Sequence, residues 1–285
     1  MTDILLDTLL DGAKLVPFLF FTYLAMEVLE HTTAGKAQER IRQSEKVGPL
    51  WGGMLGIMPQ CGFSAAASSL YAGRMITVGT LIAVFLSTSD EMLPILISEA
   101  IPAAAIAKIL AVKVIIAVAS GFFADFVYVR VTGRKEEELR IHAVCEEEHC
   151  HCEDGILLSA VKHTAKILAY ILLISLALNV LIDFVGEEAL TGLFAGAPIF
   201  GVLTAAAVGL IPNCASSVII TQLFLQGMLD AGAMMAGLLV NAGVGVFVLF
   251  RLNRSGRQNA RIVAALYAFG VFWGVVIRAA GIVFV

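Results

Sequence analysis

Long apolar segments, separated by short polar or Gly- and Pro-rich stretches, make up most of this chain. A helix needs about 20 apolar residues to cross a bilayer, and the Pro, Gly and charge punctuation predicts about ten such spans. Because backbone groups in lipid must pair within their own segment, we expect a bundle of helices. The predicted spans are residues 13–30, 48–72, 75–89, 91–105, 107–130, 160–184, 190–212, 214–229, 231–250 and 262–284.

The composition agrees with a membrane location. The 285 residues are 59% hydrophobic and 15% charged, with a mean hydropathy of +0.89, whereas soluble domains contain about 25% charged residues. The net charge of −4 gives no basic footprint for nucleic acid. The predicted partner is therefore the lipid bilayer, and a homo-oligomer is compatible with the sequence.

Basic residues are concentrated in three connecting segments, 31–47, 130–140 and 251–261, whereas the turn at 183–188 carries only acidic charges. Because cytoplasmic loops are enriched in Lys and Arg, we expect these three segments in the cytoplasm and the acidic turn outside. Both termini are then predicted outside. Arg74, in a predicted outer turn, is the one exception.

One sequence motif occurs twice, at a fixed separation along the chain. The first copy, GIMPQCGFSAAASSLY, begins at Gly56, and the second, GLIPNCASSVIITQLF, begins at Gly209. Each copy places a side-chain amide between a Pro and a Cys. Since Pro removes a backbone donor, both copies predict an interrupted helix. A single copy could be an ordinary kinked helix, but two matching copies favour a functional break.

The two copies divide the chain into units of residues 1–130 and 160–285, joined by a cytoplasmic loop at 131–159. An odd number of spans in each unit gives the two units opposite orientations. The charges agree, because the basic loop 31–47 corresponds to the acidic turn near 185–190. The predicted fold is thus an all-α polytopic membrane protein with two inverted five-helix repeats and broken helices, which is typical of secondary transporters.

Residues at the breaks suit a substrate site at the interface between the repeats. An interrupted helix exposes N–H and C=O groups to whatever occupies the break, and neighbouring amides and hydroxyls add neutral ligands. Cys61 and Cys214 supply sulfur atoms that favour soft, thiophilic ions, although a membrane Cys can equally serve in packing. The predicted substrate-binding residues are Gln60, Cys61, Ser64, Thr88, Asn213, Cys214, Ser217 and Asn241.

A second break follows each motif, at LSTSDEMLP in the first unit and at LVNAGVGVF in the second. Carboxylates at membrane depth usually serve an ion pathway or a proton relay. Asp90 and Glu91 are therefore the predicted residues for coupling to a proton or another cation, and a location in an interfacial loop is the alternative. Asp125 and Arg278, which lie at the same separation as the two motif copies, are candidates for an ion pair.

The central loop contains the segment HAVCEEEHCHCED. Short tracts rich in Cys and His commonly bind metal, and the reducing cytosol keeps such thiols free. The spacing differs from that of a folded zinc finger, so we expect a flexible metal-binding tract, with an inert solvated loop as the alternative. No other cofactor is predicted. The predicted metal ligands are His142, Cys145, His149, Cys150, His151 and Cys152.

Four segments, GIMPQCGFSAAASSLY, GTLIAVFLSTSDEMLPILISE, GLIPNCASS and GAMMAGLLVNAGVG, resemble a family of ten-span heavy-metal exporters, also described as arsenic efflux or manganese transporter proteins. The resemblance implies an inner-membrane permease that exports a metal or metalloid. The His/Cys loop is not part of the family pattern. The residues that correspond to the family motifs are Pro59, Gln60, Cys61, Asp90, Glu91, Pro212, Asn213, Cys214 and Asn241.

The predicted function is secondary-active export of a soft heavy metal or metalloid through a site at the repeat interface. The sequence contains no HExxH, GxSxG, GxGxxG or P-loop motif. We therefore expect no enzyme activity, and coupling to a proton or another cation rather than to ATP. A channel stays an open alternative, as does a carrier of a small organic or inorganic anion with no role for the cysteines. A metal sensor would leave the repeat unexplained.

Overall fold

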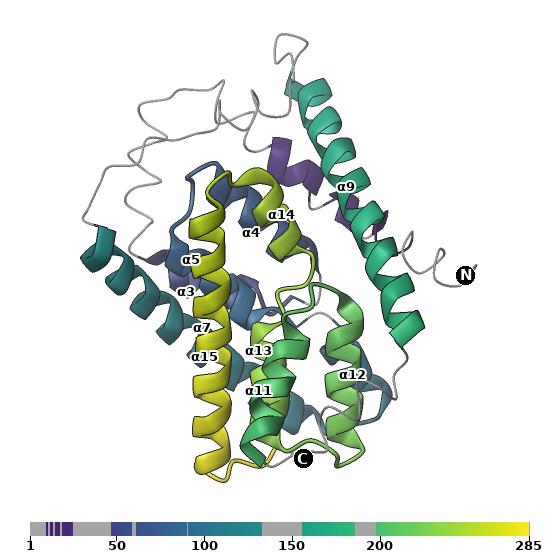
Figure 1. Ribbon diagram of the computed structural model, residues 1–285, viewed down its shortest axis with the longest axis vertical. Helices are drawn as coiled ribbons and strands as arrows, with labels where there is room; N and C mark the ends of the chain where they lie inside the picture. The colour runs from purple at the N-terminus through teal and green to yellow at the C-terminus, as the bar shows by residue number, and fades with distance from the viewer. Residues whose placement is uncertain are drawn as a thin grey trace.

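A computed structural model describes residues 10, 12–13, 15–17, 19–24, 47–58, 61–89, 91–132, 156–185 and 198–284. Every regular element within these ranges is a helix, which confirms the all-α prediction (Figure 1). The helices are α3 (Gly48–Leu55), α4 (Cys61–Ala72), α5 (Val78–Ser87), α6 (Met92–Ser98), α7 (Ala103–Thr132), α9 (Ile156–Val185), α11 (Pro198–Gly209), α12 (Cys214–Leu225), α13 (Ala231–Val240), α14 (Gly245–Leu252) and α15 (Gly256–Ala279).

Several of the described helical stretches are long and apolar enough to cross a membrane. They are Val78–Ser98, Ala103–Val131, Ala231–Leu252 and Gly256–Ala279. Together with the 30-residue helix α9, which covers the predicted span 160–184, they define a multi-pass membrane protein.

Three of the predicted spans have wrong boundaries. Residues 48–72, predicted as one helix, form the separate helices α3 and α4, of 8 and 12 residues. Residues 75–89 and 91–105, predicted as two spans, contribute to the single apolar stretch Val78–Ser98. The physical reason is length, because the seven residues of α6 rise only about 11 Å and the bilayer core is about 30 Å thick.

The helices of the two halves correspond at the same separation as the two copies of the sequence motif. Adding this separation to the number of the first residue of α4 gives the first residue of α12, and adding it to the two ends of α5 gives the two ends of α13. In the same way, the first residues of α6 and α7 correspond to the first residues of α14 and α15. The packing corresponds as well, since α5 packs against α3 and α7 as α13 packs against α11 and α15. Each half is therefore built on the same helical plan.

Glycine pairs bring the equivalent helices equally close together. A Cβ atom added to Gly121 of α7 would lie 2.6 Å from the carbonyl oxygen of Gly79 on α5. A Cβ added to the equivalent Gly274 of α15 would lie 2.8 Å from the carbonyl oxygen of Gly232 on α13. Small residues permit this approach of backbones, and both halves use them at the same positions.

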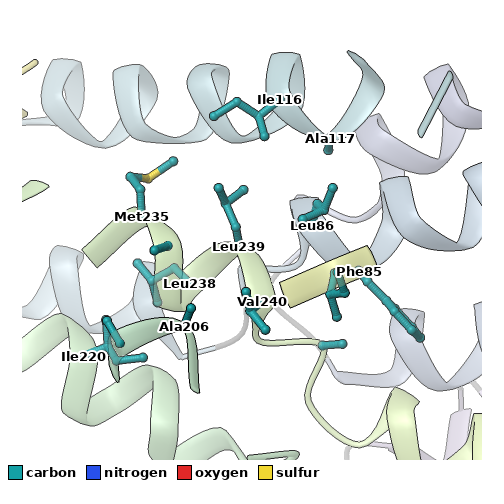
Figure 2. Close-up of a cluster of buried hydrophobic side chains, with 14 of the residues drawn as sticks. Phe85, Leu86, Ile116, Ala117, Ala206, Ile220, Met235, Leu238, Leu239 and Val240 are labelled. Atoms are coloured by element: carbon teal, nitrogen blue, oxygen red, sulfur yellow. The ribbon is translucent and has the colours of Figure 1, made fainter. Parts of the chain in front are cut away.

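The hydrophobic core joins the two halves rather than filling each separately. Phe85 and Leu86 of α5 belong to the same buried cluster as Leu238 and Leu239 of α13, beneath Ile116 of α7 (Figure 2). All five side chains are at most 3% exposed. The broken helices α5 and α13 therefore lie at the centre of the molecule.

Helix α3 runs parallel to α5, and α4 returns along the bundle. A Cβ added to Gly52 would lie 2.9 Å from the carbonyl oxygen of Thr80, and one added to Gly56 would lie 2.8 Å from that of Val84. Helix α4 then ends at Ala72, shortly before α5 begins. The beginning of α3 and the end of α4 consequently lie at the same end of α5, so α3 and α4 form a hairpin.

The second half contains the equivalent hairpin. A Cβ added to Gly201 of α11 would lie 4.0 Å from the Cβ of Ala233 on α13, and one added to Gly209 would lie 2.9 Å from the carbonyl carbon of Gly237. Helix α12 ends at Leu225, shortly before α13 begins. Helices α11 and α12 thus enter and leave beside the N-terminal end of α13.

The equivalent helices α7 and α15 run in opposite directions (Figure 1). The Lys108 ammonium donates to the carbonyl oxygen of Val283 at 2.7 Å, and the Trp273 indole N–H donates to the Ser120 hydroxyl at 3.0 Å. Near the other end of α7, the Gln258 amide donates to the Tyr128 hydroxyl at 3.3 Å. As the numbers rise along α7 they fall along α15, so the two helices are antiparallel.

These contacts define two ends of the bundle. The contact between Tyr128 and Gln258 places Arg130 at the same end as Arg251, Arg254 and Arg257, and we call it the basic end. Helix α5 begins at this end, because Thr77 donates to the Asp125 carboxylate of α7 at 2.7 Å.

Arg74, in the turn between α4 and α5, therefore lies at the basic end. The sequence predicted Arg74 at the end opposite the basic segments, whereas the hairpin of α3 and α4 brings it to the same end. The side of the membrane that this end faces stays a prediction.

Candidate functional site

The hairpin of the first half contacts the break of the second half. Ser64 and Ser68 of α4 lie against Gly245, the first residue of α14, and a Cβ added to Gly245 would lie 2.7 Å from the Cβ of Ser64. The Ser68 hydroxyl lies 2.7 Å from the carbonyl oxygen of Gly245 and 2.9 Å from that of Ser64. The predicted site residue Ser64 is fully buried in this contact.

In the second half, α12 packs against α6, the helix that follows the break of the first half. Asn213 precedes α12 as its N-cap, and its side-chain oxygen accepts from the Ala215 N–H at 3.2 Å. Ser217, one turn further, is 2% exposed. Each hairpin therefore meets the broken helix of the other half.

The first helical segment of each broken helix ends at a buried polar residue. Thr88 is the C-cap of α5 and donates its hydroxyl to the carbonyl oxygen of Val84 at 2.7 Å. Asn241, the C-cap of α13, accepts at its side-chain oxygen from the Gly243 N–H at 3.0 Å. Their exposed fractions are 2% and 3%, so both residues face the interior at the breaks.

Lys113 links the two broken helices and was not identified in the sequence analysis. Its side chain is 1% exposed. Its ammonium donates to the carbonyl oxygen of Thr88 and, at 3.1 Å, to that of Leu238 on α13. The available signal was a Lys within the apolar span 107–130, because ionisable residues inside a membrane usually have a function.

The other predicted site residues are described only in part. Cys61 and Cys214 are the first residues of α4 and α12, but their side chains lie outside the described part of the chain. Glu91 is half-buried in front of α6. Three groups of predicted residues lie outside the described ranges, namely Gln60, Asp90 and the loop ligands His142, Cys145, His149, Cys150, His151 and Cys152. The substrate, coupling and metal assignments stay predictions.

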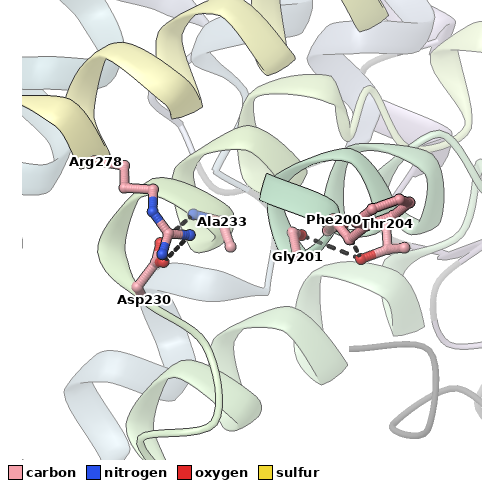
Figure 3. A network of polar contacts seen from close by, with 6 residues as sticks. All are labelled: Phe200, Gly201, Thr204, Asp230, Ala233 and Arg278. Atoms are coloured by element: carbon pink, nitrogen blue, oxygen red, sulfur yellow. Dashed lines mark hydrogen bonds and ion pairs between the residues drawn. The ribbon is translucent and has the colours of Figure 1, made fainter. Parts of the chain in front are cut away.

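The predicted ion pair between Asp125 and Arg278 is wrong. Asp125 accepts from the Thr77 hydroxyl and from the Gly79 N–H, both at 2.7 Å, at the basic end. Arg278 pairs with Asp230 at 2.6 Å near the other end of α15 (Figure 3). Asp125 and Arg278 occupy equivalent positions on α7 and α15. Because these two helices are antiparallel, the two residues lie at opposite ends of the bundle.

A pocket of about 580 Å³ lies beside Asp230 and Arg278, lined by the end of α12, the start of α13 and the end of α15. It opens at the end of the bundle opposite the basic end, and its lining contains none of the described substrate-binding candidates. Within the described ranges, no group of three or more His, Cys, Asp or Glu side chains could hold a metal ion.

Buried polar residues at interrupted helices within a bundle of apolar spans are typical of membrane transporters. The model of the family described as "Putative, 10TM heavy-metal exporter" matches residues 1–184 and 126–275 of the chain. The chain belongs to this family, as its motifs predicted. No curated protein matches the chain, and no solved structure matches it.

Proposed function

We propose that this protein is a secondary-active carrier that exports a soft heavy metal or metalloid through a site between the hairpins and the broken helices. The observation that carries the proposal is the contact of α4 with Gly245, in which one half closes the break of the other half. A site formed by both halves opens to one side of the membrane or to the other when the two halves move relative to each other.

The antiparallel packing of α7 and α15 supports an inverted relation between the two halves. If equivalent helices run in opposite directions, the two hairpins enter the membrane from opposite faces. Helices α3 and α4 rise only about 12 and 18 Å, so their tip reaches the middle of a bilayer core about 30 Å thick without crossing it. We propose re-entrant hairpins here in place of three of the predicted crossings, 48–72, 190–212 and 214–229.

Cys61 and Cys214 each begin the returning helix of a hairpin. We propose that both residues lie at the hairpin tips, beside the breaks of the opposite halves. Thiolate sulfur prefers Zn, Cu(I) and other thiophilic species over ions that favour oxygen ligands. The cargo we propose is therefore thiophilic, with the buried hydroxyls and amides around it as neutral partners.

The direction of transport follows from the distribution of charge. We propose that the basic end faces the cytoplasm of the inner membrane and that both termini lie outside. The His/Cys loop then collects metal on the cytoplasmic side, and Asp90 and Glu91 couple its export to inward movement of a proton or another cation.

The test is cargo uptake into everted membrane vesicles, with arsenite, methylarsenite, Zn²⁺ and Mn²⁺ as cargoes. In the double variant Cys61→Ser/Cys214→Ser, we expect uptake of the thiophilic cargoes to fall at least about tenfold, because hydroxyl oxygen is a poor replacement for sulfur. Any uptake of Mn²⁺, which prefers oxygen ligands, should fall less.

The matched control is the triple variant Cys145→Ser/Cys150→Ser/Cys152→Ser, which removes the remaining cysteines of the chain. It should keep maximal uptake at saturating cargo and lose only part of the uptake at low cargo concentration. Normal uptake of arsenite and Zn²⁺ by the Cys61→Ser/Cys214→Ser variant would contradict the proposal.

A carrier of small anions is the second candidate. The observation in its favour is that α4 and α12 both begin at the hairpin tips, where free backbone N–H groups and the positive ends of the helix dipoles attract anions. In that case the Cys61→Ser/Cys214→Ser variant should transport normally, and the same vesicles should take up an anion such as phosphate or acetate.

A further inference from the structure

Helices α7 and α15 touch along a line of side-chain contacts that we call the seam. The Phe123 and Phe269 rings meet edge to face, with their centroids 6.1 Å apart. The hydrogen bond from Trp273 to Ser120 lies next to this ring contact. Because α7 belongs to the first half and α15 to the second, the seam joins the two halves at the surface of the bundle.

Exposed aromatic rings border the seam on both helices. Phe123 and Phe126 of α7 and Phe272 of α15 are each 57% exposed, and Phe272 lies edge-on to Trp273 at 5.3 Å. Both helices are long and apolar enough to cross a membrane. An exposed apolar surface of this kind marks a contact with lipid or with another molecule, so the seam offers these rings to acyl chains.

Two arginines lie beside the seam at the basic end. Arg130 follows Phe126 by four positions, and Arg261 precedes Phe272 by eleven. Each arginine therefore lies on the same helix face as an exposed ring. The Arg130 guanidinium stacks over Phe126, 4.9 Å from the ring centroid.

The two arginines also lie at the same height. Arg130 is seven positions after Phe123, and Arg261 is eight positions before Phe269. Since α7 and α15 are antiparallel, both arginines lie about 10 to 12 Å from the contact between these rings, in the same direction.

The charge of these arginines is available to a ligand. Both side chains are exposed, and no carboxylate of the described residues pairs with Arg130 or Arg261. A guanidinium group presents two parallel N–H donors, which match the oxygen atoms of a phosphate.

The equivalent positions at the opposite end of the seam differ. Lys108 is equivalent to Arg261, and Val283 to Arg130. The Lys108 ammonium donates to the carbonyl oxygen of Val283 at 2.7 Å and lies 5.7 Å from the centroid of the Phe284 ring. The chain's own groups therefore contact this cation, whereas the basic end presents two exposed arginines.

We propose that the seam binds an anionic phospholipid, with its phosphate between Arg130 and Arg261 and an acyl chain along Phe123, Phe126 and Phe272. The rings alone accept the chains of any lipid, and the two guanidinium groups select a headgroup with a net negative charge. Basic residues between membrane helices bind such headgroups on the cytoplasmic side. The site requires only that the chain lies in a membrane, so it is independent of the carrier function.

The experiment uses tryptophan fluorescence. In Trp51→Phe, Trp273 beside the seam is the only tryptophan of the chain, and bromine atoms on a neighbouring acyl chain quench its emission. The protein is reconstituted in vesicles of equal parts phosphatidylglycerol and phosphatidylcholine, with dibrominated chains on one lipid or on the other. We expect stronger quenching by brominated phosphatidylglycerol, corresponding to at least about fivefold higher affinity, because one basic side chain near the headgroup contributes about this factor.

The addition of Arg130→Gln and Arg261→Gln to Trp51→Phe should make the two affinities equal within about twofold. Each single substitution should remove part of the preference, so the test does not depend on recovery of the variant with both. Equal quenching by the two lipids with both arginines present would overturn the site, as would a preference that persists after both substitutions.

The matched control is Arg74→Gln/Arg251→Gln in the Trp51→Phe background, which removes two arginines from the same end but outside the seam. Arg251 instead stacks over Tyr170 of α9. This control and Lys108→Gln should keep the preference for phosphatidylglycerol. An equal loss of preference in Arg74→Gln/Arg251→Gln would overturn the site, because the preference would then come from the charge of the whole basic end.

Discussion

The N-caps of the two broken helices occupy equivalent positions in the two halves but are different residue types. Thr77 caps α5 by accepting from the Thr80 N–H at 3.0 Å, and the equivalent Asp230 caps α13 by accepting from the Ala233 N–H at 2.8 Å. Each cap also pairs with the neighbouring helix, Thr77 with Asp125 and Asp230 with Arg278. The carboxylate lies on the neighbouring helix in the first half and on the cap in the second half.

At this scale we predict that Asp230→Ala destabilises the protein more than Arg278→Ala does. Loss of an N-cap costs about 1 kcal/mol, whereas an exposed ion pair contributes about 0.2–1 kcal/mol, and the side chains of this pair are 32% and 41% exposed. Asp230→Ala removes both the cap and the ion pair, whereas Arg278→Ala leaves the cap in place. The measurement is thermal unfolding in detergent at low and high salt.

Of the stability that each variant loses, only the part due to the ion pair should become smaller at high salt, because salt screens the pair. Thr77→Ala, which removes the equivalent cap, serves as the comparison for the salt-independent part. Equal destabilisation by Asp230→Ala and Arg278→Ala would show that the cap contributes nothing.

At the scale of the helices, close packing decides where each helix can lie. The glycine pair between α5 and α7, and its equivalent between α13 and α15, let the backbones approach until an added Cβ would overlap a carbonyl oxygen. This contact fixes the distance of α7 and α15 from the central broken helices.

We predict that Gly121→Ala and Gly274→Ala are destabilising to a similar extent. The added Cβ atoms would lie 2.6 and 2.8 Å from carbonyl oxygens, and overpacking typically costs about 1–3 kcal/mol. The gain of about 1 kcal/mol in helix propensity offsets only part of this cost. The measurement is the melting temperature of each purified variant.

The control is Gly256→Ala at the start of α15, where an added Cβ has no atom within 4 Å. It should leave the melting temperature unchanged or slightly higher. Gly121→Ala as stable as the unmodified protein would mean that α5 and α7 can separate freely.

For the whole molecule, the antiparallel relation of α7 and α15 has a consequence for topology. The hairpin α3–α4 has its base at the basic end, and the hairpin α11–α12 has its base at the opposite end, beside Asp230 and Arg278. Ten separate crossings would instead place Arg74 and the basic residue Arg254 on opposite sides of the membrane.

Cysteine labelling distinguishes these arrangements. In a variant without native cysteines, Arg74→Cys and Arg254→Cys should react with an impermeant maleimide in everted vesicles. Met228→Cys and Gly281→Cys, both exposed at the opposite end, should react only in right-side-out vesicles. Reaction of Arg74→Cys from the side of Met228→Cys would contradict the hairpins and restore the ten-span arrangement.

Much of the helical plan could be predicted from the sequence. The motifs that begin at Gly56 and Gly209 gave the separation at which the equivalent helices α4 and α12 begin, because the Pro in each motif removes a backbone donor and interrupts the helix. The predicted breaks after Thr88 and Asn241 are also present. Local chemistry determines such features, so they are visible in the chain itself.

The sequence could not show which ends meet. In the sequence, Lys113 is a charged residue within an apolar helix. Only the fold brings the carbonyl groups of Thr88 and Leu238 to its ammonium. The sequence predicted Asp125 and Arg278 as an ion pair, whereas antiparallel packing of α7 and α15 separates them. Both results depend on contacts between distant segments, which the local pattern does not contain.

The chain by itself determined that this protein is a helical, multi-pass membrane protein with two related halves, since apolar length and Pro and Gly positions are local properties. The tertiary structure alone decided that α3–α4 and α11–α12 are hairpins, that each hairpin meets the broken helix of the other half, and that one lysine contacts the ends of two helices. The physical reason is that the hydrophobic pattern gives the length of a helix but not the direction in which it packs against its neighbours.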